Sequence, residues 1–406
     1  MEINAGYKQT EIGVIPEDWN VYQFDDLGQA IIGLTYSPND VSSSGKLVHR
    51  SSNIQNNRLA FYDNVYVSST IPEKLILRNN DILICVRNGS KQLIGKSVLI
   101  KGKSIGETFG AFMSVFRPRV YAPLLYQYFI SNIVQHQITA SLGATINQIT
   151  NKTLNEFLTP FPPTLKEQKA IATALSDVDN LITNLDHLIT KKKAIKQGAM
   201  QRLLTPPHIG GKRLSGFDGE WVEKSLGSVV NYKNGAAHEN CVVKNGDFVI
   251  VNSKFVSTEG RVVKYSDENR CPVNKDEILM VLSDVPNGKA IAKCYYVETD
   301  DKYTLNQRIC SFKTDRVDPK FLFLILNRNP YYLKFDDGVK QTNLRNEDVL
   351  SCPLWLPPTK EEQQAISEII HEMNIQIESL ETKKQKYQGI KQGMMQELLT
   401  GKTRLV

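Results

Sequence analysis

Apolar residues recur every seven positions in two long segments of the chain, and this spacing predicts two long helices that share a coiled-coil seam. In the first segment, the two apolar rows are Ile171, Val178 and Leu185, and Leu175, Ile182 and Ile189. In the second segment, they are Ile366, Met373 and Leu380, and Ile370, Ile377 and Leu398. The seam is interrupted by Lys192, Lys196, Lys384 and Lys391, where we expect the packing to loosen.

Each predicted helix opens with Pro-Pro-Thr. Thr164 suits the N-cap, and Glu167 three residues later completes a capping box, as Glu362 does in the second copy. A helix over residues 165–203 would be roughly 58 Å long at about 1.5 Å per residue. We expect two such helices to pack antiparallel as a rod between two globular domains. Gly198 and Gly393 indicate either close helix–helix approach or fraying.

The chain is an internal duplication. The segment from Pro162 to Thr205 matches the segment 195 residues later at 19 of 44 positions. Fainter matches precede both segments, and they pair Trp19 with Trp221, which we expect in the cores. The order is therefore domain, helix, domain, helix, with the domains more diverged than the helices.

The globular parts show short strand-like runs separated by turns rich in Asn, Gly and Ser. The expected strands are Lys46–Arg50, Asp81–Val86, Lys96–Ile100, Phe248–Val251, Ile278–Leu282 and Ala292–Val297. A helical run follows in each part, over Leu124–Gln137 and Lys320–Leu326. The predicted fold class is α+β: two mixed α/β domains joined by two long antiparallel coiled-coil helices, with internal pseudo-two-fold duplication.

Composition adds limits to this picture. With 406 residues and 41% hydrophobic residues, the chain is long enough for two domains and is not broadly disordered. We find neither an apolar run of about 18 residues nor a signal peptide, so we expect a cytoplasmic protein without a membrane partner. The net charge of +6 permits an acidic partner without requiring one. The six cysteines lack metal spacing and are expected to be reduced and buried.

Catalytic motifs fail when tested. The stretch from Gly89 to Ser97 resembles a phosphate loop but has one residue too many between its glycines. The sequence Asn329-Pro330-Tyr331-Tyr332 resembles a methyltransferase motif but lacks its second proline, which favours a helix end. The histidines are scattered without partner spacing. We therefore expect no catalytic residues, no metal site and no cofactor.

The motifs taken together resemble the specificity subunit of type I restriction–modification systems. The resemblance rests on residues 7–19, on two Pro-Pro-x-x-x-Glu-Gln-x-Ala-Ile helix openings, and on two Lys-Gln-Gly-x-Met-Gln-x-Leu-Leu-Thr helix ends. The final stretch from Leu399 to Leu405 fits as well. One departure is the linker after the first helix, residues 206–214, which is longer than its counterpart and leaves the geometry of that joint open.

The resemblance implies a non-catalytic subunit that recognises a bipartite, asymmetric target in double-stranded DNA. It implies target-recognition domains over residues 1–157 and 206–352, a first spacer helix over 158–205, and a second spacer helix with a C-terminal tail over 353–406. Two methyltransferase subunits, which modify adenine N6, and restriction/translocase subunits would be its partners. The alternatives are a restriction-type endonuclease, a fused restriction–modification enzyme, or a structural coiled-coil protein.

Base readers are expected among loop side chains that make bidentate contacts or hydrogen bonds to base edges. In the first domain the candidates are Arg50, Ser52, Asn53, Arg87, Asn88, Lys91, Thr145, Asn147 and Gln148. In the second domain they are Asn252, Lys254, Asn287, Lys289, Lys340, Gln341 and Asn343.

Overall fold

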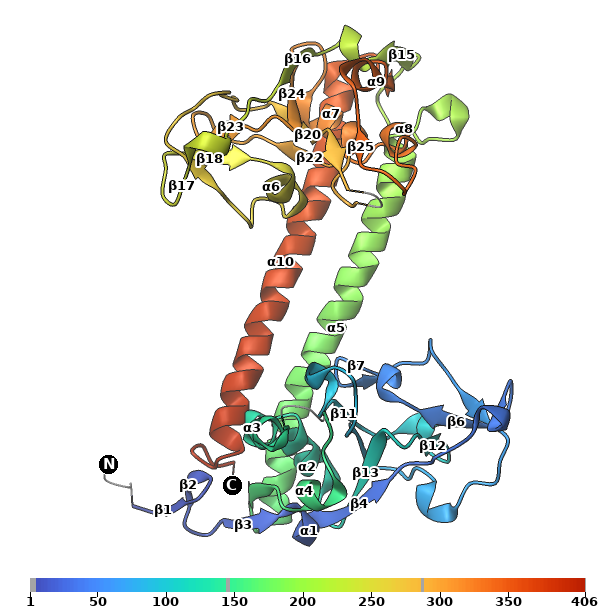
Figure 1. Ribbon diagram of the computed structural model, residues 1–406, viewed down its shortest axis with the longest axis vertical. Helices are drawn as coiled ribbons and strands as arrows, with labels where there is room; N and C mark the ends of the chain where they lie inside the picture. The colour runs from blue at the N-terminus through green and yellow to red at the C-terminus, as the bar shows by residue number, and fades with distance from the viewer. Residues whose placement is uncertain (1–4, 144–146, 286–287, 406) are drawn as a thin grey trace. The chain divides into compact units, whose positions relative to one another are not determined.

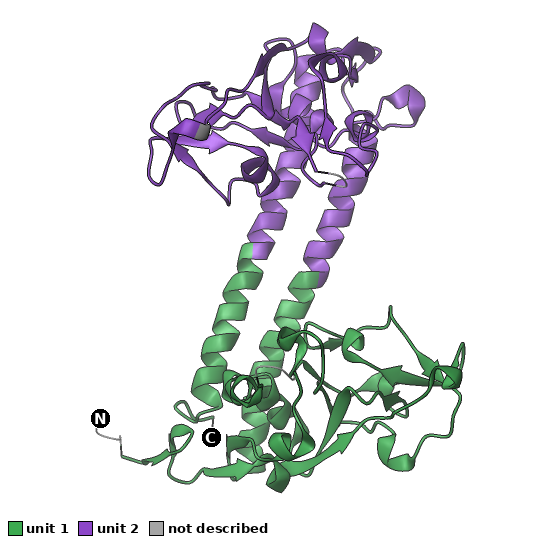
Figure 2. Ribbon diagram, in the orientation of Figure 1, with its two compact units in different colours: residues 1–186, 382–406 green, residues 187–381 purple. Residues whose placement is uncertain are grey.

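The chain forms two compact units, and both long helices contribute to each of them (Figure 1, Figure 2). The first unit comprises residues 1–186 and 382–406, and the second comprises residues 187–381. The structure is a computed structural model that describes residues 5–143, 147–285 and 288–405.

The first unit contains two four-stranded sheets and three short ladders. Its strands are β1 (Tyr7–Thr10), β2 (Gly13–Pro16), β3 (Asn20–Gln23), β4 (Gly28–Ile32), β5 (Val41–Ser42), β6 (Lys46–His49), β7 (Ile54–Gln55), β8 (Arg58–Leu59), β9 (Tyr66–Val67), β10 (Ile82–Cys85), β11 (Ser97–Leu99), β12 (Thr108–Phe109), β13 (Met113–Pro118) and β14 (Leu158–Phe161). The antiparallel sheet has the order β11–β10–β13–β4. The second sheet, β12–β6–β9–β5, includes the parallel pair β12–β6.

The second unit repeats this arrangement. Its strands are β15 (Val222–Ser225), β16 (Asn231–Asn234), β17 (Val242–Val243), β18 (Phe248–Val251), β19 (Tyr265–Ser266), β20 (Ile278–Val281), β21 (Ser283–Asp284), β22 (Cys294–Tyr296), β23 (Tyr303–Leu305), β24 (Ile309–Lys313), β25 (Thr342–Asn343) and β26 (Pro353–Leu356). The orders β22–β20–β24–β16 and β23–β18–β19–β17 match those of the first unit strand for strand, including one parallel pair, β18–β23. The predicted duplication and the α+β class are therefore confirmed in the globular parts as well.

The helices follow the same order only in part: the first helix of each copy lies at a different place, before β4 in one and after β18 in the other, and the remaining four correspond. They are α1 (Phe24–Leu27), α2 (Ala122–Phe129), α3 (Asn132–Ser141), α4 (Asn151–Asn155) and α5 (Leu165–Leu203), then α6 (Ser253–Ser257), α7 (Pro319–Leu326), α8 (Pro330–Leu333), α9 (Asn346–Leu350) and α10 (Lys360–Leu398). Residues 329–330 begin α8, with the Asn329 side chain as its N-cap, so this motif starts a helix where we predicted an end.

Strands β10 and β20 lie at the centre of each core, because both of their faces are buried. Ile82 and Ile84 pack with the helices, whereas the alternate residues Leu83 and Cys85 pack in a separate cluster against the second sheet. Ile278 and its alternating neighbours divide in the same way between two clusters in the second unit. The period of two along a strand thus produces three layers in each unit: helices, sheet and sheet.

The two long helices are present as predicted, and ten of their twelve predicted seam residues are buried, whereas Met373 and Leu380 are half-buried. All six predicted seam residues of α5 are buried, and in α10 Ile366, Ile370, Ile377 and Leu398 are. In the first unit, the beginning of α5 packs with the end of α10; in the second unit, the end of α5 packs with the beginning of α10. The helices are therefore antiparallel within each unit.

Three of the four lysines that interrupt the seam, Lys192, Lys384 and Lys391, form bonds across it. In the first unit, the Nζ of Lys391 lies 2.7 Å from Asp179, and that of Lys384 lies 2.6 Å from Asp186. In the second unit, Lys192 donates to Gln376 over 2.8 Å. Polar cross-links therefore replace apolar packing at these three positions.

Each long helix begins with a buried glutamate that is paired with an arginine from beyond the end of the other long helix. Glu167 accepts from Nη2 of Arg404 over 2.9 Å and from the indole of Trp19 over 3.3 Å. Glu362 accepts from Nη2 of Arg213 over 2.6 Å. Both carboxylates are at most 1% exposed. The Thr164 and Thr359 hydroxyls accept from the backbone N–H of Glu167 and Glu362, as a capping box predicts. The two carboxylates, however, accept hydrogen bonds from the arginines.

The longer first linker reaches the same arrangement as the short second one. After the turn Pro207–Ile209, Lys212 N–H donates to the Arg202 carbonyl, so the chain folds back and presents Arg213 to Glu362. In the second copy, the turn is made at Gly401, where φ is +72° and a Cβ would lie 2.5 Å from Pro16. The geometry that was left open at this joint is thus equivalent in both copies.

Two further expectations were wrong. The helical run at 124–137 is divided into α2 and α3, because the Ser131 hydroxyl bonds to the Tyr128 carbonyl and its backbone is extended. Gly198 and Gly393 mark neither close approach nor fraying: a Cβ at either would have no neighbour within 4 Å, and both helices continue past them.

We predict that Arg404→Ala lowers the unfolding free energy of the first unit by about 3–5 kcal/mol, because it strands the buried Glu167 carboxylate. Urea unfolding followed by Trp19 fluorescence, in a chain with Trp221 and Trp355 replaced by Phe, measures this directly. The neighbouring exposed Lys402→Ala should change it by less than about 0.5 kcal/mol. An unchanged midpoint for Arg404→Ala would contradict the assignment.

Candidate nucleic-acid interface

The side chains that we predicted as base readers in the first unit gather where β10 ends. The Asn88 amide donates to the Ser51 hydroxyl over 3.1 Å. Arg87 forms an antiparallel bridge with Gln148, and Asn88 N–H donates to the Asn147 carbonyl over 3.3 Å. Three loops that are far apart in the sequence therefore meet at one edge of the sheet.

A fourth segment, the turn at residues 110–113, joins them. The Phe112 carbonyl accepts from the N–H groups of Val86 and Arg87, both over 3.1 Å. The Phe112 ring is 57% exposed, and the Arg87 guanidinium lies over it, 5.1 Å from its centroid. We call residues 50–53, 87–91, 110–113 and 147–148 the first loop cluster.

Asn53 is the structural centre of its loop. It is fully buried, and its amide nitrogen lies within 3.3 Å of the Ala60 and Asp63 carbonyls and of the Asn64 side chain. Its side-chain oxygen accepts from Arg50 N–H over 2.9 Å. With these bonds Asn53 holds the loop in shape, while half-buried Ser52 and Arg50 remain at its surface.

A cleft of about 520 Å³ opens beside this loop, between Tyr36, Arg50, Ser52 and Phe112. Arg50 is oriented there by Asp63, whose carboxylate lies 2.7 Å from its Nη2. Hydroxyl, guanidinium and aromatic groups together suit the edge and face of a nucleobase.

The remaining candidates of the first unit tie the loops to one another. Lys91 Nζ donates to the Gly143 carbonyl over 3.1 Å, and the Asn147 amide donates to the Gly89 carbonyl over 3.0 Å. Thr145 lies outside the described residues.

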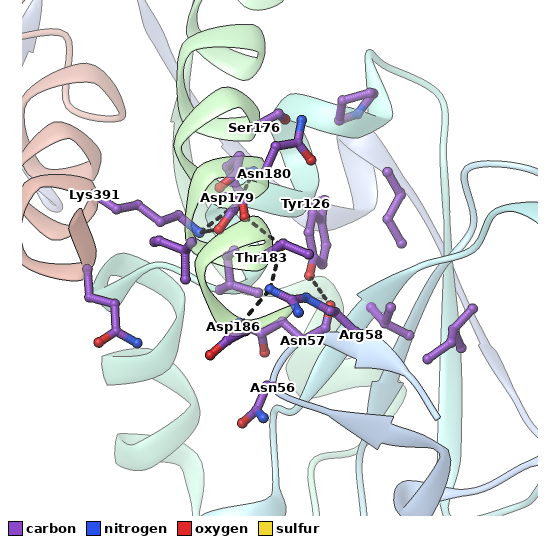
Figure 3. A pocket seen from close by; sticks show the side chains of 18 of the residues that line it. Asn56, Asn57, Arg58, Tyr126, Ser176, Asp179, Asn180, Thr183, Asp186 and Lys391 are labelled. Atoms are coloured by element: carbon purple, nitrogen blue, oxygen red, sulfur yellow. Dashed lines mark hydrogen bonds and ion pairs between the residues drawn. The ribbon is translucent and has the colours of Figure 1, made fainter. Parts of the chain in front are cut away.

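The first loop cluster is braced against the long helices through the hairpin β7–β8, which directly follows Asn53. At the far side of the hairpin lies a hollow of about 770 Å³ (Figure 3). There Arg58 donates to the Thr183 hydroxyl and lies 3.9 Å from Asp186, both on α5. The Tyr126 hydroxyl donates to the Asn57 carbonyl over 3.2 Å. The hairpin that follows Asn53 is thereby linked to α5 by polar contacts.

The second unit has an equivalent cluster where β20 ends. Strand β21 pairs with β25, which joins Ser283 to Asn343, and the Gln341 amide donates to the Ser283 hydroxyl over 2.8 Å. Asp284 accepts from the N–H groups of residues 285, 290 and 291, which closes the loop that carries exposed Lys289. Lys340 is exposed beside Gln341, and Asn287 lies outside the described residues.

The other two candidates lie at helix α6. Asn252 is its N-cap, because the side chain accepts from Phe255 N–H over 2.9 Å, and Lys254 is exposed in its first turn. The turn at residues 306–308 links this region to the loop after β20: Asn306 N–H donates to the Val251 carbonyl, and the Arg308 carbonyl accepts from Leu282.

Sequence reasoning missed these turns. Phe112 and Arg308 lie at equivalent positions between two strands, and both are exposed. The polar run Asn306-Gln307-Arg308 between apolar strands is a signal that was available, whereas an isolated phenylalanine next to a strand looks like a core residue. The cysteines and Trp19 and Trp221 are buried as predicted.

Among the described residues, no group of three or more His, Cys, Asp or Glu side chains is placed to hold a metal ion. Within the same residues, no helix combines the length and apolar character needed to cross a bilayer.

A family model described as the type I restriction modification DNA specificity domain matches the chain twice, over residues 16–197 and 218–389. The chain belongs to this type I specificity family. Each matched region covers one globular part and most of one long helix, so the family domain occurs here in two copies. The predicted resemblance is confirmed.

Relatives within the specificity family align over nearly the full length. The chain is 27% identical to a putative type I restriction enzyme MjaX specificity subunit of Methanocaldococcus jannaschii, covering 98% of this chain and 97% of that one. It is 25% identical to the StySPI specificity subunit of Salmonella potsdam, over 88% and 82%. The fold is similar to that of a type I S subunit from M. genitalium, with a TM-score of 0.61, 16% identity and 98% of both chains covered.

We predict that Asn53→Ala destabilises the first unit by about 1–3 kcal/mol, because the part-buried Ala60 and Asp63 carbonyls lose their donor and Arg50 N–H loses its acceptor. Thermal unfolding measures the loss, and Ser52→Ala on the same loop should be within about 0.5 kcal/mol of the wild type. If Asn53→Ala melts like the wild type yet loses DNA binding, Asn53 is a direct contact and not a support.

Proposed function

We propose that this chain is the specificity subunit of a type I restriction–modification complex and recognises a bipartite, asymmetric sequence in double-stranded DNA. Residues 1–157 and 206–352 form the two target-recognition domains in this proposal. Residues 158–205 and 353–406 form the spacer helices, and the complex works in the cytoplasm.

The observation that carries the proposal is one scaffold used twice with different loop side chains. The strand orders are the same, but the equivalent turns carry Phe112 in one unit and Arg308 in the other. Where Arg87 pairs with Gln148 in the first unit, Ser283 pairs with Asn343 in the second. Equal scaffolds with unequal loops suit two readers of different half-sites.

Base recognition is assigned to the loop clusters. Exposed Lys91, Lys289 and Lys340 suit phosphates, which supply affinity, whereas Arg, Asn and Gln side chains suit base edges, which supply specificity. Asn53 and Asn252 shape their loops by the bonds described above. The two half-sites would lie about one turn of DNA apart, on the order of 10 bp.

Partner subunits are assigned to the long helices. Helix α5 carries Leu181, Leu188 and Ile195, which repeat every seven residues and are 39–48% exposed. Such a row on one helix face, outside the seam, suits the docking of another protein. We assign it to methyltransferase subunits that modify adenine N6, of which the complex would hold two, with restriction/translocase subunits joining them.

In this proposal the chain itself performs no chemistry. The alternative is a restriction-type endonuclease or a fused restriction–modification enzyme. Purified chain incubated with DNA, Mg²⁺ and a methyl donor separates the two: cleavage or methylation in the absence of partners favours the alternative.

Methylome sequencing of the native host should show one split adenine motif that disappears when this gene is deleted. A deletion of the neighbouring methyltransferase gene is the control, and it should remove the same motif. An unchanged methylome, with the methyltransferase still expressed, would refute the proposal.

Inserting four residues, one helical turn, after Lys191 and after Lys383 should lengthen the unread spacer. The helices grow by roughly 6 Å, which is about two base pairs at 3.4 Å each. Both half-site sequences should stay as they are in the methylome. A change in the half-site bases would contradict the assignment of the helices as spacer.

A further inference from the structure

Arg87 differs from the other arginines of the first unit. The others are bonded through their guanidinium groups: Arg50 to Asp63, Arg58 to Thr183, Arg78 to Glu73, Arg117 to Asp81, Arg119 to the Asp25 carbonyl and Arg404 to Glu167. Among the residues that the structure describes, the Arg87 guanidinium has no hydrogen bond or ion pair; it contacts the exposed ring of Phe112.

The backbone that carries this side chain is fixed on both sides. Arg87 N–H donates to the Phe112 carbonyl, and the residue is bridged to Gln148 on the neighbouring loop. The Asn88 side chain next to it is bonded to Ser51. The backbone of Arg87 is therefore fixed. The Phe112 backbone carbonyl helps to fix it, and the Phe112 ring contacts the guanidinium at the other end of the side chain.

An aromatic ring under a guanidinium restricts its orientation and leaves its N–H edge free for other partners. Such a restriction favours bidentate hydrogen bonding, which a guanidinium can make to a phosphate as well as to a base. Among the bases, guanine offers the matching pair of acceptors, O6 and N7, in the major groove.

We propose that Arg87 is a specificity-determining residue that reads one guanine of the first domain's half-site, with Phe112 as its positioning residue. The inference rests on the proposed function and names a base contact within it. The inference applies to one half-site only. The equivalent position in the second unit is Ser283, which is 7% exposed and accepts a hydrogen bond from Gln341.

The test is methylome sequencing of the native locus, complete with its methyltransferase genes, carrying Arg87→Ala. We expect one guanine in one half-site to become degenerate, with discrimination there falling roughly 5- to 150-fold. The other half-site should be unchanged. Arg87→Lys should relax the same position, because a lysine keeps the charge but not the planar fork.

Variants of the ring separate positioning from direct contact. Phe112→Leu should relax the same base as Arg87→Ala, and Phe112→Tyr should retain the motif because it keeps a ring under the guanidinium. Discrimination that is lost equally in Phe112→Leu and Phe112→Tyr would overturn the positioning role.

Arg78→Ala is the matched control, since it removes the same charge at the opposite end of β10. It should leave every base of the motif in place. If Arg87→Ala lowers methylation at all sites without changing the motif, Arg87 contacts phosphate and the inference is overturned. If the unmutated locus yields no split motif at all, the proposed function itself fails.

Discussion

A carboxylate that is buried at the first turn of a long helix must be given a cation, and the rest of this structure depends on where that cation comes from. Glu167 and Glu362 are enclosed by the cores of their units, where an unpaired charge is costly. Each takes its arginine from the chain that follows the other long helix. Each pair therefore joins the start of one long helix to the chain that follows the other long helix, within one unit.

Once the ends are secured in this way, the loops at the far edge of the sheets are free to differ. The central strands β10 and β20 are buried on both faces, so their residues are constrained to be apolar. The turns beyond them are constrained in backbone only: Phe112 and Arg308 both accept from the strand through their carbonyls, and their side chains face outward. Backbone bonds position the segment, and the side chain is left free to differ between the two units.

The long helices could be predicted from the sequence to within a residue, because their apolar period is local and repeats over many turns. The strand order was out of reach, since pairing depends on contacts between distant segments. Asn53 looked like a reader because it is a polar loop residue, yet its burial depends on residues 60–64, which no local pattern connects to it. Phe112 could not be recognised as a surface residue, because a phenylalanine suggests a core position. Its exposure follows from the tight turn in which it lies.

The first unit is built from two separate chain segments and the second from one, and this difference affects the order in which they form during synthesis. The second unit is one continuous stretch, residues 187–381, and all of it has been translated before residue 382 is added. The first unit includes residues 382–406. Glu167 and Asp18 therefore cannot form their hydrogen bonds with Arg404 until this last segment has been made. The domain that the ribosome makes first is thus the last to be completed, and until then its buried carboxylate has no arginine.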